Sequence, residues 1–265
     1  MYNERMKSIL IQANAKINLN FKILGKRPDG YHNIESAFQS IDLADFLLIE
    51  KAKNYFSGGI ICPQSENIIL KAKNLLEKTV NKELPCRIHL QKVIPIAAGL
   101  GGGSADAAAT LTGLNLLYNL NLDRRELAEI GAKIGADVPF FLYGGTCQVS
   151  GKGEKIKPVK VRMSKFFVLF RPHKRIETKM MYKLYDKTEK DFLAICENIC
   201  PEIKKLKRYF SKFDLKLHLS GSGPTVFCQV NDYRLAKKIT EGYHEFNGDI
   251  FICHPQKEAI KVIST

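Results

Sequence analysis

The stretch Pro95-Ile96-Ala97-Ala98-Gly99-Leu100-Gly101-Gly102-Gly103-Ser104-Ala105-Asp106-Ala107-Ala108 carries the clearest structural signal in this chain. Residues 87–96 have the pattern of a β-strand, and apolar residues recur at helical spacing after Ser104. Adjacent glycines let backbone N–H groups converge on one oxyanion, and the positive end of the following helix dipole points to the same place. The sequence therefore predicts a phosphate-binding loop between a strand and a helix, and we expect Gly102 to need a positive φ angle.

Other nucleotide-binding motifs do not fit this loop. A dinucleotide fingerprint requires glycine where Ser104 stands, and a Walker A loop requires a Gly-Lys-Ser/Thr triplet, which does not occur in the chain. The His-Arg-Asp and Asp-Phe-Gly motifs of protein kinases are also absent from the sequence. A flexible surface loop is the simplest alternative, but three consecutive glycines joined to an alanine-rich helix argue against it.

A strand with two different faces precedes the loop. Residues 13–21 alternate between apolar and polar side chains, which predicts a half-buried strand with a polar face. Lys16 and Asn18 share the polar face, about 6.6–6.8 Å apart for two residues of strand. A turn is expected at 25–30, further β-structure over 34–49, and a helix over 67–78.

After the phosphate loop, the sequence predicts a helical region and then a second domain. Asp123 with Glu126 marks a helix start, and that helix should end near Gly135 because Asp137-Val138-Pro139 cannot continue it. A glycine-rich stretch and a basic stretch follow, so we predict two domains, residues 1–155 and 156–265. In the second, we expect strands at 166–170, 215–219 and 225–230, a helix at 192–199 and a turn at 220–224.

Composition limits the possible classes of function. The chain has 265 residues, which is enough for two halves sharing one interface, and it has no apolar tract long enough to span a membrane. The first ten residues do not resemble a signal peptide, so a cytoplasmic location is expected. Two close Cys/His pairs of the zinc-site kind are absent, so reduced thiols are expected at Cys62, Cys86, Cys147, Cys196, Cys200, Cys228 and Cys253.

The formal net charge of +14 allows two interpretations. One is a nucleic-acid-binding surface, and the other is an anionic small-molecule substrate on a lysine-rich chain. The sequence lacks the clustered basic and aromatic residues of nucleic-acid-binding modules, which favours the second.

Three separated motifs resemble those of the GHMP kinases, the family of galactose, homoserine, mevalonate and phosphomevalonate kinases. The first is Ala15-Lys16-Ile17-Asn18-Leu19 followed by Asp29-Gly30-Tyr31-His32, and the second is the glycine loop followed by Gly135-Ala136-Asp137-Val138-Pro139-Phe140-Phe141. The third is Leu219-Ser220-Gly221-Ser222-Gly223-Pro224-Thr225-Val226-Phe227. Their order and spacing match over nearly the whole chain. The chain departs at Ala105-Asp106, where the family often has Ser-Asn, and Asp106 opposes phosphate binding unless it faces away or meets a cation.

The resemblance implies an α/β, more exactly α+β, two-domain fold. The N-terminal half would be like domain 2 of ribosomal protein S5, the C-terminal half would be ferredoxin-like, and the active site would lie between them. The triple glycine and Tyr31-His32 are most similar to family members that phosphorylate the 2-hydroxyl of a cytidine-diphospho sugar alcohol in the non-mevalonate isoprenoid pathway. Another small-molecule acceptor (mevalonate, homoserine or a sugar) and an RNA-binding role remain the alternatives. No membrane or nucleic-acid partner is expected, and the chain would be a monomer or homodimer.

Individual roles follow from the same resemblance. Asp137 would be the general base and Lys16 would hold the reacting groups, with ATP as donor and Mg²⁺ as its counter-ion. The sequence names no certain magnesium ligand, although Ser104 is a better candidate than Asp106. ATP would contact Asn67, Lys92, Pro95, Gly99, Leu100, Gly101, Gly102, Gly103 and Ser104. The acceptor would contact Asn18, Tyr31, His32, Thr178, Tyr182, Gly221, Ser222 and Gly223, with its cytosine between Tyr31 and Tyr182 and His32 on its polar edge.

Overall fold

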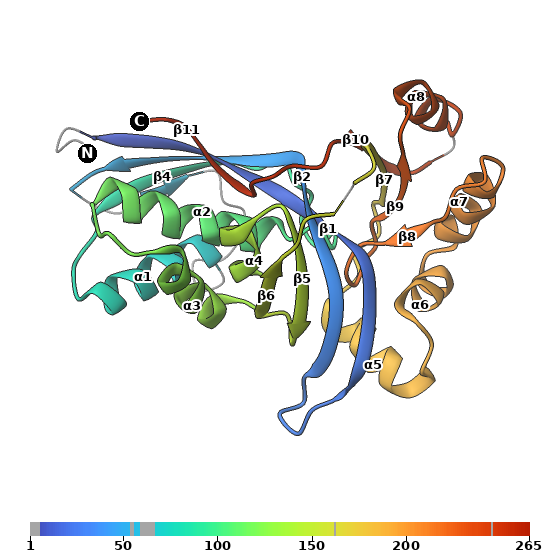
Figure 1. Ribbon diagram of the computed structural model, residues 1–265, viewed down its shortest axis with the longest axis horizontal. Helices are drawn as coiled ribbons and strands as arrows, with labels where there is room; N and C mark the ends of the chain where they lie inside the picture. Colours follow the sequence, from blue (N-terminus) through green and yellow to red (C-terminus); the bar gives the residue numbers. More distant parts are fainter. Residues whose placement is uncertain (1–5, 54–55, 59–66, 162, 245) are drawn as a thin grey trace.

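The computed structural model describes residues 6–53, 56–58, 67–161, 163–244 and 246–265. Two lobes, each a sheet with helices, lie side by side and are joined by the long strands β1 and β2 (Figure 1). Cys62 and the first five residues, which entered the expectations above, lie outside the described residues.

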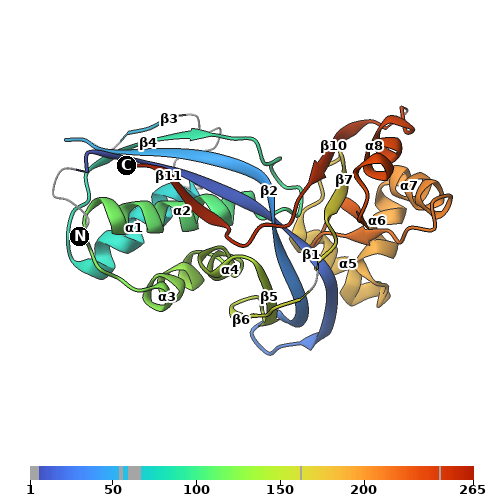
Figure 2. The same cartoon turned by 45° about the horizontal axis from the view of Figure 1, so that its top comes forward.

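The first lobe is built on a seven-stranded sheet in the order β11-β1-β2-β4-β3, with β5 paired to β2 and β6 paired to β5. Its strands are β1 (Ser8–Lys26), β2 (His32–Lys51), β3 (Phe56–Gly58), β4 (Cys86–Gln91), β5 (Thr146–Gly151), β6 (Lys155–Pro158) and β11 (Ile260–Ser264). Four helices cover one face of the sheet (Figure 2): α1 (Ile68–Val80), α2 (Gly102–Leu117), α3 (Arg124–Ile134) and α4 (Val138–Tyr143). Between the sheet and α2, alanines of the helix pack against isoleucines and leucines of β1 and β2, so the helix lies close to the sheet.

The second lobe has a four-stranded antiparallel sheet in the order β10-β7-β9-β8. Its elements in chain order are β7 (Phe166–Pro172), α5 (Thr178–Thr188), α6 (Phe192–Ile199), α7 (Pro201–Ser211), β8 (His218–Leu219), β9 (Val226–Val230), α8 (Tyr233–Glu241) and β10 (Gly248–Cys253). This is the β-α-β-β-α-β order of a ferredoxin-like domain, with several helices in the first crossover. The arrangement agrees with the expectation for the C-terminal half.

Strand β1 serves both lobes. It curves beyond the first sheet together with β2, so the hairpin between them reaches α5 (Figure 1). Phe21 and Ile23, near its end, pack against the core of the second lobe, and the Phe21 ring stacks on Phe192 at 5.3 Å. The register of β1 and β2 shifts at Asn14/Ala15 and at Asn18/Asn20, which are bulges of the kind that bend a strand.

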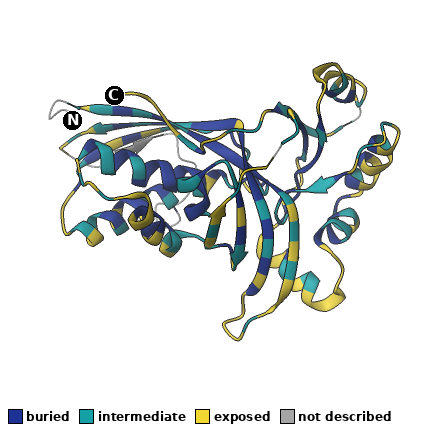
Figure 3. Cartoon of the chain, in the orientation of Figure 1, coloured by how far each residue is buried: buried dark blue, intermediate teal, exposed yellow. Residues whose placement is uncertain are grey.

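The polar face of β1 differs from the expectation. We predicted a half-buried strand, but Asn14, Lys16 and Asn18 are only 1–3% exposed. The phosphate loop and the segment before β11 cover this face: Lys16 N donates to Leu100 O, and Asn14 Nδ2 donates to Glu258 O. Figure 3 shows buried residues along the middle of β1. Because both coverings come from distant parts of the sequence, the alternating pattern alone could not predict them.

The expected boundary at residues 155 and 156 does not coincide with the division between the two sheets. Strand β6 begins at Lys155 and pairs with β5, while β11, at the end of the chain, returns to pair with β1. The second sheet therefore starts at Phe166, and the chain crosses back to the first lobe after β10.

Candidate functional site

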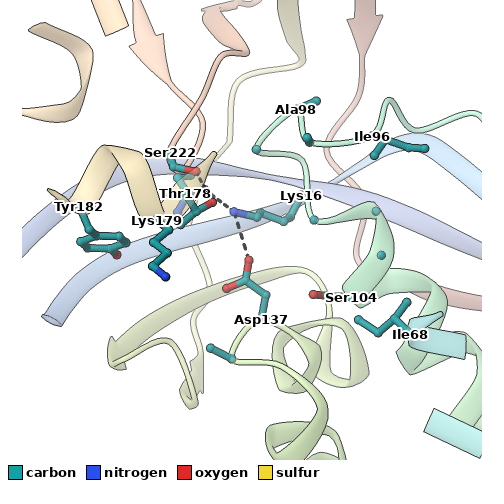
Figure 4. Close-up of a pocket in the computed structure, with 18 of the residues that line it drawn as sticks. Lys16, Ile68, Ile96, Ala98, Ser104, Asp137, Thr178, Lys179, Tyr182 and Ser222 are labelled. Carbon is teal, nitrogen blue, oxygen red and sulfur yellow. Dashed lines mark hydrogen bonds and ion pairs between the residues drawn. The ribbon is translucent and has the colours of Figure 1, made fainter. Parts of the chain in front are cut away.

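A cavity of about 1230 Å³ lies between the two lobes. Its walls come from β1, β2, the phosphate loop, the start of α2, Asp137, helix α5 and the turn at Gly221 and Ser222. Figure 4 shows Lys16 and Asp137 in the middle of this space, Ser104, Ile68 and Ile96 on one side, and Thr178, Lys179 and Tyr182 on the other. Most of the predicted nucleotide and acceptor residues therefore line one cavity, the nucleotide residues toward one end and the acceptor residues toward the other.

Backbone contacts fix the phosphate loop. Ala97, Gly99 and Gly101 have φ angles of 55°, 76° and 72°, whereas Gly102, where we had expected a positive value, does not have one. A Cβ on Gly99 would lie 2.3 Å from Ser220 O, and the Ser220 hydroxyl donates to Gly99 O at 2.9 Å. The two glycine motifs are therefore in direct contact, one from each lobe. Helix α2 starts at Gly102, so its first N–H groups lie at the cavity, as a phosphate site requires.

Lys16 and Asp137, both predicted as catalytic, meet in the centre of the cavity. Lys16 Nζ lies 3.5 Å from Asp137 Oδ2 and donates to Asn18 Oδ1 at 2.6 Å. The Lys16 side chain is 4% exposed and the Asp137 side chain 32% exposed, so the ammonium is held in place while the carboxylate is open to a ligand. Asn18 is itself fixed, because its amide donates to Ser36 Oγ. Asp137 stands between α3 and α4, in a bend rather than a long loop.

Lys92 lies between two buried carboxylates. Its ammonium contacts Asp45 and, at 3.1 Å, Asp106 Oδ2. Asp106 thus meets a cation, which was one of the two arrangements the sequence allowed. Burial raises the pKa of Asp106 to about 8 although Lys92 opposes the shift, and its Oδ1 has no hydrogen-bond partner. Lys92 remains 23% exposed at the cavity, so it can still reach a phosphate.

Three residues predicted to contact ligands have structural contacts as well. Asn67 Oδ1 caps α1 by accepting from Ile69 N and Leu70 N, although Asn67 also lines the cavity. The Leu100 side chain packs in the core and lies outside the cavity lining. Gly223 is also outside the lining, because it turns toward Cys196.

At the acceptor end, aromatic rings from both lobes are in contact. His32 stacks on Tyr182 with centroids 4.8 Å apart, and Tyr182 meets Phe192 edge-on at 5.0 Å. Burial raises the pKa of Tyr182 to about 12, whereas Tyr31 is 58% exposed with Lys152 Nζ 4.9 Å from its ring centre. His32 already covers one face of Tyr182, so a ring held between Tyr31 and Tyr182 would use the opposite face. The Thr178 and Ser222 hydroxyls share a hydrogen bond of 2.7 Å.

The sequence interpretation missed several residues of this end. Lys179 and Lys183 are four apart on α5, a spacing that places both on one helix face and that could have been read from the sequence. No local sequence signal identifies the other missed residues, because the β1–β2 hairpin, α5 and α6 come together only in the folded structure. The missed lining residues of this end include Lys152, Lys179, Lys183, Asp186 and Phe192.

Two kinds of feature were not found in the part of the chain that the structure describes. No helix there is long and apolar enough to cross a membrane. No cluster of three or more His, Cys, Asp or Glu side chains is arranged to hold a metal ion. The six described cysteines are buried and free.

Comparison with known proteins shows which family this chain resembles. The model of the GHMP kinases N-terminal domain matches residues 67–145, and the GHMP kinases C-terminal model matches residues 179–248. A 4-diphosphocytidyl-2-C-methyl-D-erythritol kinase of Bacillus cereus is 38% identical, covering 92% of this chain and 95% of the relative. The enzyme of the same name from Carboxydothermus hydrogenoformans is 40% identical, covering 93% of this chain and 96% of the relative.

Solved structures show the same fold. A crystal structure of 4-(cytidine 5'-diphospho)-2C-methyl-D-erythritol kinase superposes with a TM-score of 0.80 at 28% identity, covering 93% of this chain and 99% of that one. A homoserine kinase from Cytophaga hutchinsonii gives 0.79 at 16% identity, covering 99% of each chain, which shows the fold alone. The expected two-domain fold is therefore confirmed.

Proposed function

The chain belongs to the GHMP kinase family, and we propose that it transfers the γ-phosphoryl group of ATP to the 2-hydroxyl of 4-diphosphocytidyl-2-C-methyl-D-erythritol, a step of the non-mevalonate isoprenoid pathway. The observation that carries this proposal is the Lys16–Asp137 pair, placed between the phosphate loop and the aromatic end of one cavity. Two relatives named for this acceptor, which match more than nine-tenths of the chain, support the choice of acceptor.

The chemistry needs little beyond positioning and charge. Asp137 accepts the proton of the acceptor hydroxyl as that oxygen forms a bond to the γ-phosphorus, and the bond from the γ-phosphorus to the bridging oxygen of ADP breaks. Lys16, 3.5 Å from Asp137, stabilises the negative charge on the reacting oxygens. The N–H groups at the start of α2 and Lys92 hold the phosphates that leave with ADP.

At the nucleotide end, most ligands of a magnesium ion would come from the nucleotide rather than from the protein. Ser104 offers a hydroxyl at the cavity, and Asp106 has an oxygen without a hydrogen-bond partner, but its other oxygen already contacts Lys92. Mg²⁺ commonly takes one or two protein ligands beside phosphates and water. Ser104 would hold the ion, which would neutralise negative charge on the nucleotide phosphates.

The acceptor end suits a cytidine diphosphate. Aromatic rings can stack on a flat pyrimidine, and the ammonium groups of Lys152, Lys179 and Lys183 at the same end favour an anionic group. The formal net charge of +14 fits an anionic substrate in the same way. A cytoplasmic location, where ATP is available, belongs to the same proposal.

Acceptor competition tests the proposal directly. Formation of ADP is measured with the cytidyl acceptor, mevalonate, homoserine and no acceptor, at equal concentrations. We expect turnover with the cytidyl acceptor at least ~10²-fold above the others, because unpaired groups in a polar site penalise a wrong ligand. Comparable rates with mevalonate or homoserine would show that the acceptor has been misassigned within the family.

A further inference from the structure

Asp186 joins the two lobes at the mouth of the acceptor end. Its Oδ2 lies 2.5 Å from Lys26 Nζ, at the end of β1, and its Oδ1 lies 2.7 Å from His32 Nε2, at the start of β2. The carboxylate itself belongs to α5, which runs beside the β1–β2 hairpin in both views (Figures 1 and 2). One side chain thus contacts both strands of the hairpin from the opposite lobe.

Helix α5 is attached to its surroundings mainly by apolar and ring contacts. Met181 is its one buried residue among the described side chains, Leu184 is partly buried against the core of the second lobe, and Tyr182 and Tyr185 each contact the rings of His32 and Phe192. The Thr178 hydroxyl adds a hydrogen bond to Ser222. Because Lys179, Tyr182 and Lys183 on this helix line the cavity, the position of α5 sets the shape of the acceptor end.

The contact with Asp186 also determines which nitrogen of His32 carries a proton. Lys26 and then His32 hold the pKa of Asp186 below its usual value, so the carboxylate is ionised and can only accept. His32 Nε2 must therefore donate, and in the neutral ring Nδ1 is left as an acceptor. The ring is 5% exposed and stacked on Tyr182, so it has little freedom to turn.

We propose that Asp186 is a positioning residue for the acceptor: it fixes the orientation and tautomer of His32 and, with Lys26, fastens α5 to the β1–β2 hairpin. Asp186 acts through His32 and α5 rather than on the reacting atoms. The kinetic consequence rests on the function proposed above, whereas the effect on His32 does not.

Asp186→Asn keeps the size of the side chain and removes its charge and one acceptor. We expect KM for the cytidyl acceptor to rise about tenfold, with kcat and KM for ATP changed less than about twofold, because each hydrogen bond to a charged group is worth a factor of this order. Lys26→Met, which breaks the more exposed pair, should raise acceptor KM by about two- to fivefold. Glu189→Gln removes one charge from the exposed end of α5 without touching the hairpin, and it should change neither KM.

Nitrogen-15 NMR of the histidine rings tests the positioning without any turnover. His32, assigned by its loss in His32→Gln, should show the Nε2–H tautomer in the wild type and a mixture of tautomers in Asp186→Asn. Wild-type spectra in the variant, or a rise of both KM values together, would overturn the proposal. If the wild type fails to use the cytidyl acceptor, the proposed function is wrong, and the NMR result still decides the role of Asp186.

Discussion

The two ends of the cavity are held together by different means. At the nucleotide end, backbone groups of the phosphate loop bond to β1 and to the second glycine motif, and glycines allow approaches that a Cβ would block. At the acceptor end, side chains from two lobes meet through ion pairs and ring contacts, with Lys26 56% exposed. A backbone-built site accepts few substitutions, whereas side chains can be exchanged one at a time. The contrast suits a family that keeps ATP and varies its acceptor.

The largest effect is expected where the two ends meet. Asp137→Asn should lower kcat by about 10²–10⁴-fold, the usual contribution of a positioned base, while ATP affinity stays within a few-fold. The side chain is nearly unchanged in size and is 32% exposed, so stability should hold. Single-turnover kinetics and calorimetric ATP titration measure the two quantities. A variant with half of the wild-type rate would remove Asp137 from the mechanism.

The acceptor end should respond in KM alone. Tyr182→Ala should raise KM for the cytidyl acceptor by about 5–150-fold, the range for losing one aromatic stack, and should leave KM for ATP nearly unchanged. Tyr31→Ala should lie at the low end of that range, because this ring is 58% exposed. Tyr182→Phe is the matched control, since it keeps the ring. Equal shifts in both KM values would show that the two ends are not separable.

Much of the nucleotide end could be predicted from the sequence. The glycine loop and the helix after it are local features, and the structure confirms both. The helix start predicted at Asp123 and Glu126, outside this end, is another local feature that the structure confirms. Lys16 and Asp137 were predicted through motif resemblance, and their 3.5 Å separation follows from the fold. Local signals suffice where a function uses backbone geometry over a few adjacent residues.

The remaining features depend on contacts between distant segments. Asp45, which holds Lys92, carries no motif, and Asp186 is an ordinary charged helix residue until the hairpin lies beside it. The return of β11 to β1 likewise depends on pairing between the two ends of the chain. The conformation at Gly102 was misjudged, because the consecutive glycines hid the residue at which the helix begins.

Two neighbouring glycines test how tightly the backbone end is packed. A Cβ on Gly102 would lie 2.7 Å from Lys92 Nζ and 2.9 Å from Ile94 Cγ2, whereas on Gly103 the nearest atom is Ile68 Cγ2 at 3.8 Å. Gly102→Ala should cost about 1–3 kcal/mol of unfolding free energy through overpacking. Gly103→Ala, its control, should be neutral or stabilise by up to about 1 kcal/mol, as Gly→Ala in a helix does. Urea unfolding without nucleotide measures both, and equal values would contradict the tight packing at Gly102.

An effect that depends on pH concerns the buried charges behind the loop. Burial raises the pKa of Asp106 from its ordinary 3.8 to about 8, so the folded state binds a proton that the unfolded state has released. Between these two pKa values, stability must fall as the pH rises, and above about 8 the loss is complete. A carboxyl group with this shift therefore destabilises the fold at alkaline pH.

Asp106→Asn removes this titration while Lys92 keeps its contact with Asp45. The variant should gain stability relative to the wild type from pH 6 to pH 8, by no more than about 1.4 kcal/mol for each pH unit, and the difference should level off at higher pH. Titrating groups away from Asp106, Lys92 and Asp45 cancel, because both proteins share them. Urea unfolding at pH 6, 7, 8 and 9 gives the difference directly. A constant difference across this range would mean that Asp106 is ionised throughout. The attraction of Lys92 would then offset the cost of burying the Asp106 carboxylate.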